Sequence, residues 1–132
     1  MWATWMQRFT ELERSAAAGQ AQERAMWAGL PMRPDPILAK QVGDRFVQPW
    51  SSLHQTFGLA STAAGLPSAV SADYQAYLGL RVAYYQAVVR RCLNPTPTTQ
   101  AQLVEHERRI DTFVGARRRS STVGDGQVNR PG

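Results

Sequence analysis

The sequence predicts an all-α protein, a small bundle of four to five helices followed by a disordered basic C-terminal tail. Apolar residues recur at spacings of three and four along most of the 132-residue chain, which is the period of an amphipathic helix. Glycine, proline and capping residues interrupt that period where helices would begin and end. Clusters of Thr, Val and Ile nowhere alternate with polar residues over the length of a strand, so no β-sheet is expected.

The first helix is expected over residues 2–28. Its apolar residues share one face and are Trp2, Trp5, Met6, Phe9, Leu12 and Ala16. The helix should stop where Gly29 can adopt the left-handed conformation that ends many helices. Pro31 prevents continuation because it lacks a backbone N–H, and a proline-rich connector follows over residues 31–36.

Two shorter helices are expected after this connector. Asp35 is predicted to cap the first of them, with Pro36 at the first helical position, where its missing N–H costs nothing. Pro49 should end that helix, and Ser52 with Gln55 resembles the capping box of the next. The latter helix should end where the tetrapeptide Ala-Gly-Leu-Pro, which also closes the first helix, recurs.

The fourth helix, expected over residues 71–93, is apolar nearly all round. Arg81 is its only charged residue between Asp73 and Arg90. Because a helix of this kind is buried on most sides, either the other helices surround it or partner subunits cover part of it. Its two apolar faces are formed by Tyr74, Leu78, Tyr85, Val89 and Cys92, and by Tyr77, Leu80, Tyr84 and Val88.

The fifth helix is expected to begin at a capping box of Thr99 and Gln102 and to end near Arg117. Its apolar stripe consists of Leu103, Ile110, Phe113 and Val114. Residues 119–132 are rich in Ser, Gly, Asp and Asn and should form a flexible tail. We therefore expect a single helical domain over residues 1–118.

Composition and charge favour a cytoplasmic protein. The apolar fraction is 43% and the charged fraction 19%, which is typical of a globular rather than a disordered chain. Cys92 is the single cysteine, so no internal disulfide can stabilise the fold, and a reducing compartment is expected. Neither a signal peptide nor a membrane-spanning segment is recognisable, so no membrane partner is expected. The net charge is +5, and all 15 basic residues except Lys40 are arginines.

No catalytic, cofactor or metal site is predicted. His54, His106 and Cys92 are the only soft metal ligands, and they lie far apart along the chain. The neighbouring arginines could make Cys92 reactive, although a cysteine on an apolar helix face is more typical of a small buried hydrophobe. The chain has no glycine-rich phosphate loop and no Gly-x-Ser-x-Gly turn. An enzyme is therefore not expected.

The leading functional hypothesis is a non-enzymatic structural or adaptor protein, which assembles with copies of itself or with other protein chains. Small helical adaptors of phage particles and of bacterial multiprotein machines have this general character. Trp and Tyr dominate interaction hot spots, and two tryptophans near the N-terminus must be covered either by a partner or by the protein's own core. The expected partner-binding residues are Trp2, Trp5, Tyr77, Tyr84 and Tyr85.

The alternative hypothesis is a nucleic-acid-associated protein. Its phosphate-binding residues would be Arg90, Arg91, Arg117, Arg118 and Arg119. The basic excess is not concentrated, because residues 1–30 carry three Arg against three Glu, and residues 95–132 carry six Arg against four acids. No helix-turn-helix, zinc-finger or RNA-binding signature accompanies the arginines. Cations near a helix C-terminus also suit the helix dipole, which offers a purely structural explanation.

Overall fold

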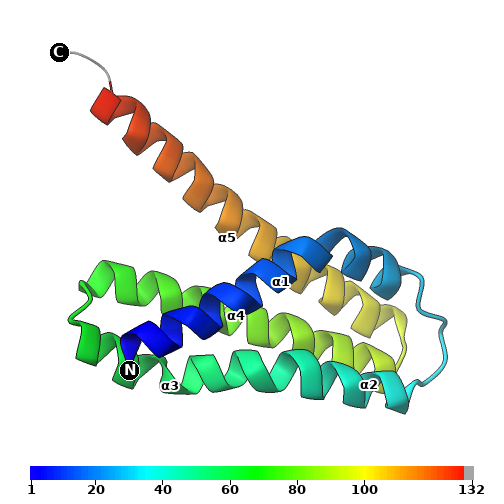
Figure 1. The fold of residues 1–132 in the computed structure, drawn as a ribbon. Helices are drawn as coiled ribbons and strands as arrows, with labels where there is room; N and C mark the ends of the chain where they lie inside the picture. The colour runs from blue at the N-terminus through cyan, green and yellow to red at the C-terminus, as the bar shows by residue number, and fades with distance from the viewer. Residues whose placement is uncertain (130–132) are drawn as a thin grey trace.

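A computed structural model describes the backbone of residues 1–129 and the side chains of residues 1–117. Within this range the protein consists of helices packed together, with no β-strand, which confirms the predicted fold class (Figure 1). The elements are α1 (Trp2–Ala28), α2 (Pro36–Val42), the π-helical turn η1 (Gly43–Val47), α3 (Gln48–Ala64), α4 (Ser68–Leu93) and α5 (Pro97–Asn129).

The central element of the bundle is α4. It packs against α5, against α2 and η1, and against α3, whereas α1 packs mainly on α3. In Figure 1, α1 crosses the bundle obliquely, and α5 crosses α4 before it diverges from the other helices. The candidate site is lined by residues of α1, α4 and α5.

The hydrophobic core is built around α4, whose Leu78, Tyr85 and Val88 are completely buried. The sequence left open whether other helices of the chain or partner subunits cover α4. In the structure, helices of the same chain cover these residues. Full burial of one large apolar side chain contributes about 1.5–3 kcal/mol, so this core is the main source of stability. The other buried apolar residues are Trp5, Phe9, Ala16, Trp27, Ala39, Val42, Trp50, Leu53, Phe57, Ala60, Tyr77, Val82, Tyr84, Ala87, Cys92, Leu103 and Ile110.

The predicted break at Pro49 is wrong, because α2, η1 and α3 follow one another without a loop. Pro49 lies in the first turn of α3, directly after the π-helical turn. A proline inside an α-helix clashes with the carbonyl four residues earlier and cannot donate to it. In η1 the N–H of Gln48 bonds five residues back, to the carbonyl of Gly43, and this wider turn accommodates the ring.

The predicted capping box of Ser52 and Gln55 is wrong for the same reason, since both residues lie inside α3. The Gln55 amide instead donates to the Ser51 hydroxyl at 3.5 Å. The Ser52 carbonyl accepts from the hydroxyl of Thr56 at 2.8 Å, which is a bond within the helix and not a cap.

Two of the predicted helix ends are confirmed. The Asp35 carboxylate accepts from the N–H of Leu38 at 3.0 Å and caps α2, whose first residue is Pro36. At the end of α3, Gly65 has a φ of 65° in the left-handed region. Its N–H bonds to the Thr62 carbonyl, and the next N–H bonds to the carbonyl of Ser61. These two bonds form a Schellman motif.

The end of α1 differs from the prediction, because Gly29 has a φ of −86° and is not left-handed. The carbonyls that follow are bonded from another helix instead. Arg91 of α4 donates to the carbonyls of Leu30 at 2.8 Å and Pro31 at 3.3 Å. Backbone bonds from the N–H groups of Gly29 and Leu30 close the last turn of α1 without a left-handed residue, and Arg91 binds the segment that follows.

The beginning of α5 also differs, because Thr96 and Thr99 form the capping box that was predicted for Thr99 and Gln102. The N–H of Thr99 donates to the Thr96 hydroxyl at 3.1 Å, and the N–H of Thr96 donates to the Thr99 hydroxyl at 2.9 Å. The backbone of α5 extends beyond Arg117, to Asn129. The side chains of the predicted tail, residues 119–132, lie outside the described residues.

Candidate docking groove and buried arginine

The residues predicted to bind a partner lie mostly inside the bundle. Trp5, Tyr77, Tyr84 and Tyr85 are all buried, whereas Trp2 is half-buried. The indole N–H of Trp5 donates to the carbonyl of Leu53 at 3.1 Å and connects α1 to α3. Trp2 stacks on Trp5 with 5.2 Å between the ring centroids. Trp5, Tyr84 and Tyr85 therefore belong to the core, whereas Tyr77, which is 8% exposed, also lines the groove described below.

The arginines predicted to bind phosphate are not brought together in the part of the chain with described side chains. Arg90 is exposed, but Arg91 is 2% exposed and bonded to backbone carbonyls. Arg117 forms a two-pronged ion pair with Asp73, near the opposite end of α4 from Arg90. At 1.5 Å per residue, Asp73 and Arg90 are about 26 Å apart along the helix.

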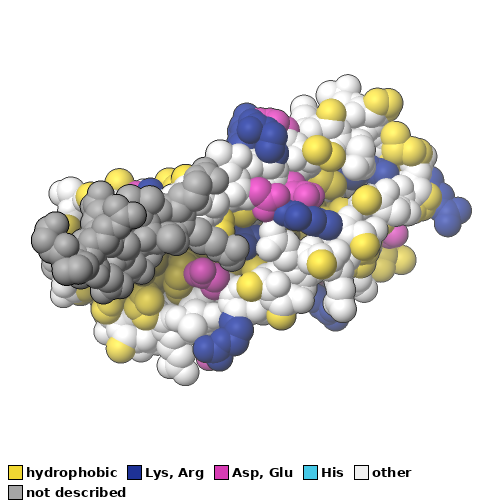
Figure 2. Space-filling model, turned by 90° about the horizontal axis from the view of Figure 1, so that it is seen from above, with side chains coloured by type: hydrophobic (Ala, Val, Ile, Leu, Met, Phe, Trp, Pro, Cys, Tyr) yellow, Lys and Arg dark blue, Asp and Glu magenta, His cyan; other side chains and the backbone are white. Residues whose placement is uncertain are grey.

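The charges on the visible surface are also mixed. On the face shown in Figure 2, Lys and Arg side chains lie among Asp and Glu side chains and form no continuous basic patch. Arg118 and Arg119 lie outside the residues whose side chains are described. This face therefore shows no phosphate-binding stripe of the kind that nucleic-acid-binding domains present.

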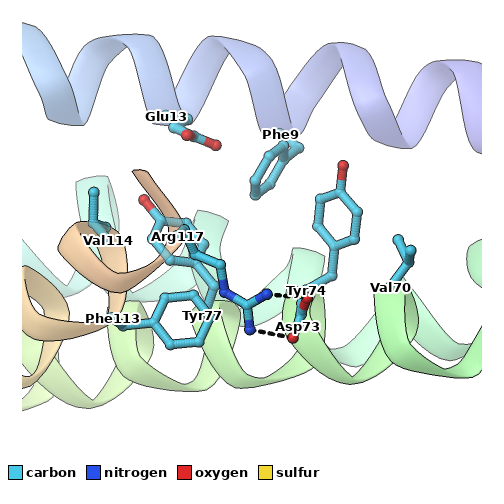
Figure 3. Close-up of a pocket in the computed structure, with 9 residues that line it drawn as sticks. All are labelled: Phe9, Glu13, Val70, Asp73, Tyr74, Tyr77, Phe113, Val114 and Arg117. Carbon is cyan, nitrogen blue, oxygen red and sulfur yellow. Dashed lines mark hydrogen bonds and ion pairs between the residues drawn. The ribbon is translucent and has the colours of Figure 1, made fainter. Parts of the chain in front are cut away.

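An open groove of about 450 Å³ lies between α1, α4 and α5 (Figure 3). Its walls are largely apolar and aromatic. Phe9 projects into it from α1, and its ring lies 5.4 Å from Tyr74 and 6.1 Å from Tyr77, both on α4. The complete lining is Phe9, Glu13, Val70, Asp73, Tyr74, Tyr77, Phe113, Val114 and Arg117. We call this feature the aromatic groove.

Charged groups stand at the edges of the aromatic groove. The Arg117 guanidinium bonds to both carboxylate oxygens of Asp73 and lies 4.8 Å from the centre of the Phe113 ring (Figure 3). Across the groove, the Glu13 carboxylate makes no hydrogen bond or ion pair with a described residue. Burial raises the pKa of Glu13, and the positive charge of Arg81 partly opposes that rise. Asp73 is thus neutralised within the chain, whereas Glu13 is not paired directly.

Arg81 lies beneath the groove and is only 6% exposed. Its Nε donates to the Tyr77 hydroxyl at 2.9 Å, and its guanidinium lies 5.3 Å from the Tyr77 ring and 5.7 Å from the Trp50 ring. No carboxylate among the described residues lies within 4.0 Å of it, so its nearest acids, Glu13 and Glu23, act from further away. A buried charge without a direct partner is costly and therefore informative.

A partly enclosed cavity of about 190 Å³ adjoins the guanidinium of Arg81. Its lining is Glu13, Ala17, Gln20, Tyr77, Arg81, Ile110, Asp111, Val114 and Gly115. Glu13, Tyr77 and Val114 also line the aromatic groove, so the two spaces share a wall. We call this second space the polar chamber.

Ion pairs on the surface connect α1 with α5 beside the chamber. Arg24 bonds to Asp111 and pairs with Glu107 at 2.8 Å. Gln20 donates to the second carboxylate oxygen of Asp111 at 3.2 Å. Asp111 is therefore occupied, in contrast to Glu13.

The surroundings of His54 and Cys92 do not indicate a metal site or a reactive thiol. No group of three His, Cys, Asp or Glu side chains suited to a metal ion occurs among the described residues. His54 contacts the Gln75 amide at 3.1 Å on the surface. Cys92 is 1% exposed, and burial raises the pKa of its thiol, which disfavours the reactive thiolate.

Comparisons of the chain with protein-family models, with curated proteins and with solved structures gave no match. Among the helices described, none has the length and apolar character needed to cross a membrane. Sequence reasoning missed Phe9, Glu13, Asp73 and Phe113 as groove residues, because the groove forms only where three helices meet. The one visible signal was Arg81, the isolated charge on an apolar helix.

Proposed function

We propose that the protein is a non-enzymatic helical adaptor that receives an amphipathic helix of another protein chain in the aromatic groove. The observation that carries this proposal is the groove itself, an apolar channel of about 450 Å³ that remains open beside a well-packed core. A groove between helices suits the docking mode in which the apolar face of a partner helix fills a hydrophobic channel.

The charges at the groove indicate the chemistry of the partner. Asp73 is paired with Arg117, and Glu13 has no direct partner among the described residues. The remaining acidic group is complemented by a basic side chain. We therefore expect a helix whose apolar face has a lysine or arginine at its edge. Val70, which is 38% exposed on the wall, supplies apolar surface for it.

A displayed library of helical peptides tests this function directly. Peptides selected on the full-length protein should carry apolar residues at helical spacing beside a basic residue. Val70→Asp places a charge in the groove, and it also lies in the first turn of α4, where an acid suits the helix dipole. We expect this variant to weaken peptide binding by roughly tenfold, because the carboxylate must be desolvated on docking.

The matched control is Leu59→Asp, which adds the same charge at a residue that is 69% exposed and does not line the groove. This variant should bind the selected peptides as the unaltered protein does. Equal losses in the two variants, or selection of peptides without apolar helical spacing, would reject the groove as the docking site.

Light scattering coupled to size-exclusion chromatography separates the other possible occupants. A stable dimer that Val70→Asp dissociates would replace the partner helix by a second copy of the chain. A complex with a high ratio of absorbance at 260 nm to that at 280 nm, lost in high salt, would favour the nucleic-acid alternative. A monomer without bound nucleic acid is the result expected for an adaptor without its partner.

A further inference from the structure

The polar chamber beneath the groove contains hydrogen-bonding groups that the fold does not use. Arg81 borders it, and only its Nε has a hydrogen-bond partner among the described residues, the Tyr77 hydroxyl. The two terminal nitrogens of this guanidinium, which carry four of its five N–H donors, have none. The side chain as a whole is 6% exposed, and these nitrogens are not among the fully buried atoms, so the solvent that enters the chamber can reach them.

An unused acceptor lines the same chamber. This acceptor is the carboxylate of Glu13, which lines the chamber from α1, whereas Arg81 lines it from α4. The carboxylate lies more than 4.0 Å from the nitrogens of Arg81. The other carboxylate of the chamber, Asp111, is bonded to Arg24 and Gln20. The chamber thus offers free donors on α4 and one free acceptor on α1, with an open space between them.

The balance of charge selects the ligand class. A simple anion would pair with Arg81 but would face the charges of Glu13 and Glu23, and a simple cation would face Arg81. A molecule that carries both charges satisfies the two free groups and leaves the net charge of the chamber unchanged. We propose that the polar chamber binds a small zwitterion of the α-amino acid class, with its carboxylate on Arg81 and its ammonium group on Glu13.

The chamber has room for a small ligand. Its volume of about 190 Å³ is well above the space of about 10–15 Å³ that one water needs. Ala17, Ile110 and Val114 form an apolar wall against which a short side chain can pack. L-Alanine, whose side chain is a single methyl group, suits this wall.

This proposal does not depend on the adaptor function, although both use the carboxylate of Glu13, which lines the groove as well as the chamber. The two also fail separately. Val70→Asp, which alters the aromatic groove, lines no part of the chamber and should leave binding of the zwitterion unchanged. Loss of peptide docking would therefore leave the chamber proposal standing, and the reverse also holds.

The experiment is a calorimetric titration of the full-length protein with L-alanine, with acetate and with ethylammonium. Acetate and ethylammonium carry only one of the two charged groups. We expect saturable binding of L-alanine at millimolar or lower concentration. Each half-ligand should bind at least roughly tenfold more weakly, because one charge-assisted hydrogen-bonding group is lost.

The deciding variant is Glu13→Gln, which keeps the shape of the side chain and lies on a half-buried face of α1. It should weaken binding of L-alanine by roughly tenfold, whereas Glu11→Gln, an exposed change on the same helix, should not alter it. Absence of saturable binding at millimolar concentration would identify the chamber as a water-filled cavity and overturn the proposal. Acetate that binds as well as L-alanine, or Glu13→Gln that binds normally, would do the same.

Discussion

At the scale of single residues, neighbouring side chains of the same type can have opposite roles. Arg90 and Arg91 are adjacent on α4 and look equivalent in the sequence. The structure exposes the first and buries the second, which contacts the end of α1 and the Gln100 side chain of α5 at 2.7 Å. Arg91 therefore joins three helices at one end of the bundle, whereas Arg90 faces solvent.

This difference leads to a paired prediction. Arg91→Ala should lower the free energy of unfolding by about 1.5–3 kcal/mol, because the buried guanidinium no longer donates to the carbonyls of Leu30 and Pro31. Arg90→Ala should change it by less than about 0.5 kcal/mol, as is usual for an exposed residue. Urea denaturation followed by circular dichroism measures both values. Equal effects would show that Arg91 does not support the end of α1.

A second residue-scale prediction concerns Glu23, which is 7% exposed and whose pKa is raised above 4.5 by burial. The folded protein then binds more protons than the unfolded chain between pH 4.5 and the folded-state pKa. Stability is fully present below pH 4.5 and falls as the pH rises through the folded-state pKa. Glu23→Gln removes the titrating group and should remove this fall.

The measurement is the difference in unfolding free energy between Glu23→Gln and the unaltered protein, determined from pH 4.5 to neutrality. The difference should grow in favour of the variant as the pH rises. Comparison of the two proteins cancels the contribution of the exposed Glu105, whose pKa Arg108 and Arg109 lower to about 2. A difference that stays constant with pH would show that the carboxyl of Glu23 is not perturbed.

At the scale of the elements, two glycines of α3 allow a test of its C-terminal cap. Gly65 follows α3 in the left-handed conformation, and Gly58 lies within the helix; an added Cβ would meet no other group within 4 Å at either residue. Gly65→Ala should destabilise the protein by about 1 kcal/mol through backbone strain alone. Gly58→Ala should stabilise it by about 0.5–1 kcal/mol through higher helix propensity. Thermal denaturation checks the opposite signs, and a shared sign would contradict the cap.

The elements also show what the sequence can and cannot predict. The helical period gives all the long helices, and Asp35 with Pro36 gives the start of α2, because these signals are local. The effect of Pro49 could not be predicted, since it depends on a wider helical turn directly before it. The conformation of Gly29 was mispredicted, because backbone bonds close the end of α1 without a left-handed residue, and Arg91, more than sixty residues away, binds the segment that follows. Local signals predicted the helices well, but they do not contain the tertiary contacts that shape a helix end.

The candidate site was harder to predict than the fold, for a related reason. Tyr77, Tyr84 and Tyr85 were expected on a partner surface. Their helix is apolar nearly all round, so its sequence does not show which face is buried in the core. The structure buries all three, and burial raises the pKa of each hydroxyl. Of the three, Tyr77 also lines the aromatic groove, whereas Tyr84 and Tyr85 do not.

At the scale of the whole molecule, the packing of the helices predicts an order of opening. α4 is surrounded by α2, η1, α3 and α5, whereas α1 packs mainly on α3 and borders both the aromatic groove and the polar chamber. Its connections to α5 are exposed ion pairs of Arg24, which contribute little individually. We expect amide hydrogen exchange to be slowest in α4 and faster in α1, because four elements cover α4 whereas α1 packs mainly on one.

The variant Trp5→Phe tests this order of opening. It keeps an aromatic ring in the core but removes the indole donor to the carbonyl of Leu53, which is the buried hydrogen bond between α1 and α3. Amide exchange measured by mass spectrometry should become faster throughout α1. The amides of α4 around Tyr85 should keep their exchange rates, because opening of α1 alone does not expose them. An equal acceleration in both helices would mean that the bundle opens only as one cooperative unit. In that case α1 could not move to admit a ligand to the chamber, and entry would have to occur through the open aromatic groove that shares its wall.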